Sequence, residues 1–153
     1  MRYFLDTEFN GFGGALLSLA LVGEDSRDEL YFIVKAPTDL HPWVERNVMP
    51  FLDHVPSAHR APPLERADAA HALGNFLAHD HDAEIIADWP EDIAQINMLL
   101  LTGPGEIVRT PPLRFRFYPL PGFSTAGSSA VPHNALHDAR ALRDHVLSLE
   151  DHG

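Results

Sequence analysis

The chain has 153 residues, with 22 acidic and 11 Lys or Arg side chains, and a formal net charge of −11. This length is typical of one ordinary domain, so we expect a single domain over residues 1–153 with a core that needs no covalent staple. The absence of cysteine excludes a disulfide framework, a thiolate zinc site and a cysteine nucleophile. The excess of acids disfavours nonspecific binding to a long polyanion.

The chain begins without a basic segment followed by an apolar stretch, and no apolar run approaches about 20 residues. We therefore expect no signal peptide, no membrane span and a cytoplasmic location.

Residues 3–9 form an apolar run that contains two carboxylates. If the run is a strand, its period of two places Phe4, Asp6 and Glu8 on one face. Neighbouring like charges cost free energy unless a cation lies between them, so the pair suggests a divalent metal site. The alternative is an edge strand with two solvated acids.

Residues 10–14 carry strong turn chemistry, and we expect strands at 15–22 and 30–34 that complete an antiparallel meander. Apolar spacing then predicts helices at 43–52 and 64–79. A short strand at 84–87 should pair parallel to the first. The intervening tract His79-Asp80-His81-Asp82 resembles a metal cluster, but we interpret it as a solvated helix end and turn.

The next helix begins near residues 88–92. Asp88 is placed to be its N-cap, with Glu91 closing a capping box. Asp92 differs because, at about 100° per residue, it falls within the angular range of an apolar stripe. That stripe consists of Ile93, Ile96, Leu99 and Leu100. The Asp92 carboxylate should therefore point toward the core side, where a charge needs a partner.

Residues 102–132 are rich in Pro, Gly and Ser, apart from an expected strand at 114–118. Arg114, Arg116 and Tyr118 share one face of that strand, either as a phosphate-contacting row or as gatekeeping charges of an edge strand. The following segment, Pro119 to Pro132, suits a lid beside an active site or a plain linker.

The last predicted helix covers 134–149 and has its own apolar stripe. The stripe consists of Ala135, Ala139, Leu142, Val146 and Leu149. Asp138 lies on its flank and is the second acid directed to the buried side. His133 precedes Asp138 by five residues, whereas His137 should project to the opposite side and be solvated.

Three of these features together resemble the exonuclease motifs of the DEDDh branch of the DnaQ-like 3′-to-5′ exonucleases. They are Asp6-Thr7-Glu8-Phe9 on the first strand, Asp92 at a helix start after a strand, and His133-x-Ala135-x-x-Asp138 on the last helix. The opening segment is most similar to a compact bacterial exoribonuclease-like subfamily related to oligoribonuclease and ribonuclease T. The resemblance implies an α/β, ribonuclease-H-like mixed sheet, an antiparallel meander followed by parallel strands, with helices on both sides.

The chain departs from the family in the middle motif. The family commonly has an Asn four residues before the acid and an aromatic residue just before it, where this chain has Asp88 and Glu91. Asp92 remains the expected ligand because of its helical phase, but Asp88 could replace it or assist through a water.

The resemblance implies a metal-dependent 3′-to-5′ exonuclease, most readily an exoribonuclease, that cleaves 3′ ends of single-stranded RNA or DNA and short oligonucleotides. Asp6, Glu8, Asp92 and Asp138 would hold two Mg²⁺ or Mn²⁺ ions, and hard carboxylate oxygens suit these ions. Such ions, about 3.5 to 4 Å apart, activate a water and stabilise the leaving 3′-oxygen. Asp6 would bridge both ions, Glu8 and Asp138 would complete the nucleophile side, and Asp92 would act on the leaving-group side through water. A homodimer is a further family expectation.

Within this scheme His133 is the candidate general base, since imidazole titrates near working pH. Phe9, Phe12 and Leu16 are candidates for stacking on terminal bases, although packing in the hairpin core is the more economical interpretation of Leu16. Two other functions remain open. The scaffold could be a catalytically weak nucleic-acid or nucleotide-binding module, or a phosphodiesterase that acts on dinucleotides.

Overall fold

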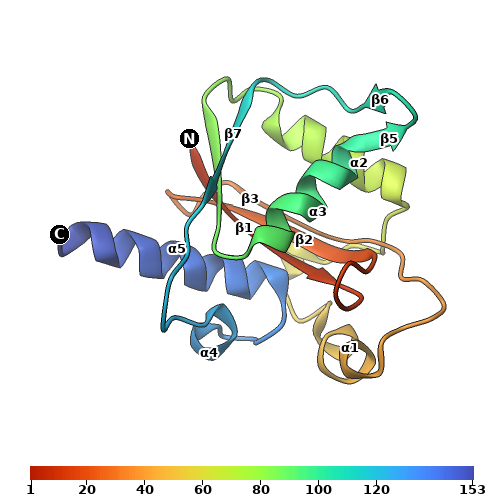
Figure 1. The fold of residues 1–153 in the computed structure, drawn as a ribbon, viewed down its shortest axis with the longest axis horizontal. Helices are drawn as coiled ribbons and strands as arrows, with labels where there is room; N and C mark the ends of the chain where they lie inside the picture. The colour runs from red at the N-terminus through yellow and green to blue at the C-terminus, as the bar shows by residue number, and fades with distance from the viewer.

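The computed structural model describes all 153 residues and shows an α/β fold with a five-stranded mixed sheet in the order β3-β2-β1-β4-β7. The strands are β1 (Arg2–Phe9), β2 (Leu16–Gly23), β3 (Glu29–Ile33), β4 (Ala83–Ala87) and β7 (Leu113–Phe117). β1, β2 and β3 form an antiparallel meander, while β4 pairs parallel to β1 and β7 parallel to β4. The expected meander and the parallel addition of the fourth strand are confirmed (Figure 1).

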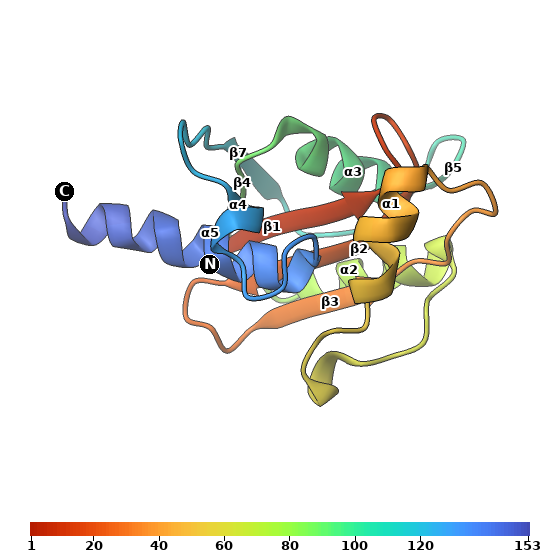
Figure 2. The ribbon, with the colours of Figure 1, turned by 90° about the horizontal axis from the view of Figure 1, so that it is seen from below.

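Helices cover both faces of this sheet. α2 (Arg66–Leu77) and α3 (Pro90–Leu100) lie on one face, and α5 (Ala135–Asp151) lies on the other (Figures 1 and 2). The remaining elements are short. They are α1 (Pro42–Asn47), the 3₁₀ turns Met49–Phe51 and Ser57–His59, α4 (Thr125–Ser128) and a two-stranded ribbon of β5 (Leu101–Gly103) and β6 (Glu106–Ile107). None of the helices has the length and apolar character needed to cross a membrane.

The period of two in β1 assigns its side chains to the two layers. Leu5 packs with Leu73 of α2 and Ile96 of α3, whereas Phe4 packs with Leu142 and Val146 of α5. Burying each such side chain stabilises the fold by roughly 1.5 to 3 kcal/mol. The Phe4 face also carries Asp6 and Glu8, so both acids lie on the α5 side of the sheet.

The turn between β1 and β2 is tight, and its glycines are required. Gly11 and Gly13 have φ values of +75° and +68°, and a Cβ on Gly14 would lie 1.9 Å from the Asn10 carbonyl oxygen. A β-bulge between Glu8 and Phe9 interrupts the register just before the turn. The bulge changes the direction of the backbone at the point where the Glu8 side chain leaves the sheet.

Several predicted boundaries were wrong. The helix expected over 43–52 ends at Asn47 and continues as a 3₁₀ turn, because Pro50 lacks the N–H that an α-helix needs. The stretch expected to be irregular contains the β5–β6 ribbon and α4. The stripe of α5 ends before Leu149, which is 45% exposed.

The capping box at α3 is also wrong. The N-cap of α3 is Trp89, without a side-chain cap, and Pro90 occupies the first turn, where its missing N–H costs nothing. Glu91 instead accepts a 2.8 Å hydrogen bond from the Gly13 amide, which joins the hairpin turn to α3. Asp88 is therefore free of a capping role.

Candidate metal centre

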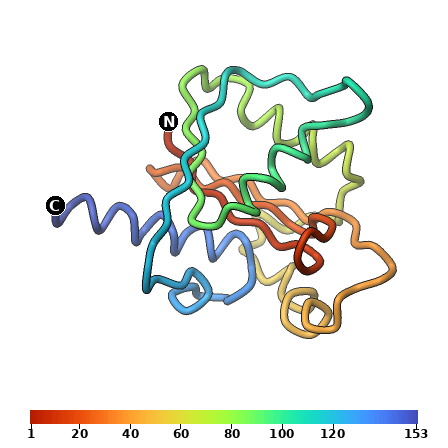
Figure 3. The backbone as a smooth tube through the Cα atoms, viewed as in Figure 1, coloured from red at the N-terminus to blue at the C-terminus, as the bar shows by residue number.

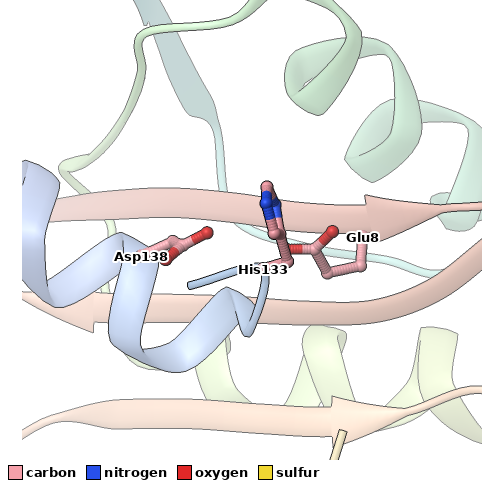
Figure 4. A group of neighbouring side chains, drawn as sticks. All are labelled: Glu8, His133 and Asp138. Atoms are coloured by element: carbon pink, nitrogen blue, oxygen red, sulfur yellow. The ribbon is translucent and has the colours of Figure 1, made fainter. Parts of the chain in front are cut away.

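Three side chains from separate parts of the chain meet at the α5 side of the sheet. Glu8 comes from β1, Asp138 from the first turn of α5, and His133 from the segment just before that helix. Each offers a ligand atom, and these atoms all lie within 4.8 Å of one another (Figure 4). The expected grouping of Glu8, His133 and Asp138 is thus present.

Asp6 lies at the centre of the acidic charge. Its side chain is buried, and burial together with the charges of Asp92, Glu8 and Asp138 raises its pKa well above the ordinary range of an aspartate. Its Oδ2 atom is buried without a hydrogen-bond partner, as is Oδ1 of Asp138. Buried carboxylate oxygens without partners are costly, so both atoms favour a cation as their neighbour.

The pKa values of the other acids near Asp6 are raised as well. Burial and then the charge of Asp138 raise the pKa of Glu8 to about 8. Burial raises the pKa of Asp138 to about 6, opposed by hydrogen bonds from Ser129 and the His133 backbone. Such a set of hard oxygen donors fits Mg²⁺ or Mn²⁺, whose charge would offset the repulsion.

Asp92 joins the cluster from α3, on the other face of β1. It is 3% exposed, and its Oδ1 accepts hydrogen bonds from the Thr7 hydroxyl at 2.6 Å and the Thr7 amide at 3.2 Å. Burial raises its pKa to about 7, while the Thr7 hydroxyl opposes that rise. No hydrogen bond engages its other oxygen, which is available to a water or an ion. The expectation that Asp92 points to the buried side is confirmed.

Asp88 follows β4 directly and is half-buried beside this cluster. Burial raises its pKa, and its charge raises the pKa values of Asp6, Asp92 and Asp138. Asp88 therefore belongs electrostatically to the site as a fifth acid, in keeping with the auxiliary role considered for it.

His133 is held in an uncommon backbone conformation, with φ of +61°. Histidine enters the left-handed region more readily than most residues. The ring of Trp43, from α1, lies edge-on to the His133 ring with centroids 4.9 Å apart and planes at 82°. This contact was missed from the sequence, because nothing local links residues 90 positions apart.

The neighbouring His137 differs from its expected place. It is half-buried, and its Nε2 lies 2.9 Å from the His54 carbonyl oxygen. Its ring therefore has a structural partner outside the acidic cluster. The helix itself is capped by Asn134, whose side chain accepts hydrogen bonds from the amides of Leu136 and His137.

A pocket of about 440 Å³ opens beside Glu8 and includes Phe9, Phe12, Trp43 and Trp89 in its lining. Phe9 and Phe12 are thus placed where a ligand of the site could stack. Leu16 is not, because it is 1% exposed in the main core, and its expected role in substrate contact is corrected to packing.

The other charged features considered from the sequence have partners away from the site. Asp80 pairs with the N-terminal amine and Asp82 with Arg114, so the His79-to-Asp82 tract forms no metal cluster. Arg116 lies over the ring of Tyr118 at 4.8 Å.

In comparisons with known proteins, no family model and no curated protein matches the chain. The residues and geometry of this site are therefore the basis for inferring its function.

Proposed function

We propose that this protein is a metal-dependent 3′-to-5′ exonuclease of the DEDDh type, acting on short or single-stranded nucleic acid, RNA foremost. The observation that carries the proposal is the convergence on Asp6 of acids from β1, α3 and α5, with His133 beside two of them. The strand order β3-β2-β1-β4-β7 and the helices on both faces support a ribonuclease-H-like fold.

Asp6, Glu8, Asp92 and Asp138 are the side chains that would hold two divalent ions. When bound, such ions activate a water and stabilise the charge on a leaving oxygen. The unpartnered oxygens of Asp6 and Asp138 are available for this purpose, and Thr7 fixes the Asp92 carboxylate in one orientation. Asp88 adds negative charge that strengthens the attraction for cations.

His133 is the proposed proton acceptor. Its neutral ring nitrogen takes a proton from the attacking water, and the Trp43 ring restricts the orientation of the imidazole. Preorganisation of this kind means that the base needs no large rearrangement before the proton is transferred.

The substrate end would be held chiefly by stacking. Phe9, Phe12 and Trp43 line the pocket beside Glu8, and aromatic side chains bind any base through its π-face. The net charge of −11 opposes long electrostatic contact with a polyanion, which confines binding to the nucleotides nearest the site.

The direct test is cleavage of a 5′-labelled RNA oligomer by the purified protein with Mn²⁺, with EDTA as the metal-free control. The expected products shorten one nucleotide at a time from the 3′ end and release nucleoside 5′-monophosphates. Binding without turnover would indicate a nucleic-acid-binding module instead.

A further inference from the structure

The side chain of Asn10 joins the turn between β1 and β2 to the segment that leads into α1. Its Nδ2 donates to the Asp39 carbonyl oxygen at 2.8 Å, and its Oδ1 accepts from the His41 amide at 2.7 Å. The turn and this segment lie side by side, in red and orange, in Figures 2 and 3. One carboxamide thus supplies both a donor and an acceptor to a segment about 30 residues away in the chain.

The same segment fixes the start of α1. His41 is the N-cap of this helix, and its Nδ1 accepts a hydrogen bond from the Trp43 amide at 3.2 Å. α1 has six residues, of which only Val44 is buried, and Val44 packs in a small cluster with Leu17. Because a helix of this length is not stable by itself, its orientation depends on that packing and on the contacts at its ends.

The Trp43 ring is the part of α1 that reaches the candidate base. The ring is 44% exposed and contacts His133 edge-on, with centroids 4.9 Å apart. Since burial does not enclose the Trp43 ring, the position of its backbone decides where the ring lies against His133.

The far end of the α1 segment is anchored separately. Asn134 is buried and donates from its Nδ2 to the Phe51 carbonyl oxygen at 2.8 Å. Residues 42–51 are therefore held at one end by Asn10 and at the other by the residue that follows His133. Loss of the Asn10 bonds should shift the Trp43 end of this segment while the Phe51 end stays beside α5.

The turn that carries Asn10 is itself fixed to α3. The Gly13 amide donates to Glu91 at 2.8 Å, and Gln95 donates from its Nε2 to the Gly14 carbonyl oxygen at 2.9 Å. Asn10 therefore holds the α1 segment against a part of the molecule that is anchored to the helix of Asp92.

We propose that Asn10 is a positioning residue for the base, which sets the orientation of the His133 imidazole through residues 39–41 and Trp43. This inference rests on the proposed exonuclease function and deepens it, because it assigns control of the base to the turn between β1 and β2. Asn10 lies outside the acidic cluster and does not line the pocket beside Glu8. Its effect should therefore appear in turnover and not in Mn²⁺ affinity.

The first measurement follows the His133 ring directly, by NMR of the full chain with Mg²⁺ at constant pH. The ring-proton signal of His133 is identified by its absence in His133→Ala, and the neighbouring Trp43 ring shifts it. Trp43→Leu should remove that shift, and Asn10→Ala should move the signal in the same direction. Gln95→Ala is the matched control, because it removes a bond to the same turn that does not involve residues 39–41, and it should leave the signal in place.

The second measurement is a double-mutant cycle on kcat with saturating RNA and Mn²⁺. Asn10→Ala should lower kcat by roughly 10- to 100-fold, up to the cost of displacing a catalytic group by about 1 Å. In the His133→Ala background the same substitution should change kcat by less than about twofold, because its effect passes through the missing ring. A role in stability alone would lower kcat in both backgrounds.

An unmoved His133 signal in Asn10→Ala, or an equal loss of kcat in the two backgrounds, would overturn the positioning role. If Asn10→Ala does not fold, Asn10→Ser takes its place, since its hydroxyl is too short to make both bonds and should give the same shift. Absence of cleavage by the wild-type protein would overturn the exonuclease proposal. The NMR signal would then still decide whether Asn10 orients the His133 ring.

Discussion

The Thr7 hydroxyl donates a 2.6 Å hydrogen bond to Oδ1 of Asp92, which joins β1 to the first turn of α3 through buried side chains. The two residues are separated by 85 positions in the chain. Thr7 points to the opposite face of β1 from Asp6 and Glu8. The bond therefore holds an acid from the α3 layer beside acids that project into the α5 layer.

Thr7→Val keeps the shape of this side chain and removes the hydroxyl. We expect the pKa of Asp92 to rise further, because the opposing hydrogen bond is lost. The free energy of unfolding should fall by about 1 to 2 kcal/mol, and turnover by roughly 10-fold. Thr102→Val, at an exposed position on β5, is the control and should change neither quantity. Unaltered turnover in Thr7→Val would show that the orientation of Asp92 does not matter for catalysis.

Asp138→Asn should abolish cleavage and leave the metal-free protein as stable as before, or more stable. The reason is that Asp138 repels Glu8, and its Oδ1 is buried without a partner. Thermal melts should show that Mn²⁺ raises the wild-type melting temperature and does so much less in the variant. A free energy of unfolding of the metal-free variant that is lower by several kcal/mol would indicate that Asp138 is a structural partner.

The metal-free protein should lose stability as pH rises from about 4 to about 8. Folding raises the pKa values of Glu8, Asp92 and Asp138 to about 8, 7 and 6. Between the ordinary pKa near 4 and these values, the folded state binds more protons than the unfolded state, so deprotonation favours unfolding. The loss should be on the order of a few kcal/mol in denaturant titrations.

Saturating Mn²⁺ should remove most of that pH dependence, because a bound cation stabilises the ionised carboxylates. A metal-free stability that instead rises over this pH range would contradict the raised pKa values.

His133→Ala should lower turnover by roughly 10² to 10⁴-fold while leaving Mn²⁺ affinity nearly intact. His137→Ala is the control, because its ring contacts the His54 carbonyl and lies outside the acidic cluster. The His137→Ala variant should keep the wild-type rate, even if the loss of the His54 contact lowers its melting temperature. Loss of Mn²⁺ binding in His133→Ala would make His133 a metal ligand instead of the base.

Affinity for RNA should level off beyond a few nucleotides. The acidic surface repels additional phosphates, so only those near the metal centre contribute. Fluorescence anisotropy with oligomers of increasing length, at several salt concentrations, measures this directly. A salt dependence whose slope grows steadily with length would contradict it. Fast cleavage restricted to two-mers would favour a dinucleotide phosphodiesterase.

Local sequence patterns were sufficient to predict the layers of this fold and the faces to which its acidic side chains point. Alternation in residues 3–9 correctly predicted that Asp6 and Glu8 share a face, and helical phase correctly predicted that Asp92 and Asp138 are buried. These successes follow from periods of 2 and 3.6, which are properties of the local backbone. A different local signal failed at Asp88, where a capping pattern was present but Trp89 is the N-cap and the helix begins at Pro90.

Only the tertiary structure decided which distant side chains meet. Examples are the Thr7–Asp92 bond, the Trp43–His133 contact and the aromatic pocket at the end of β7. Each joins segments whose separation depends on the sheet order and on several turns. Leu16 was ambiguous for the same reason, because β2 is buried along its whole length by residues of other elements, which its own sequence does not specify. A period specifies the direction of a side chain relative to its own backbone, whereas its neighbours depend on how separate elements pack together.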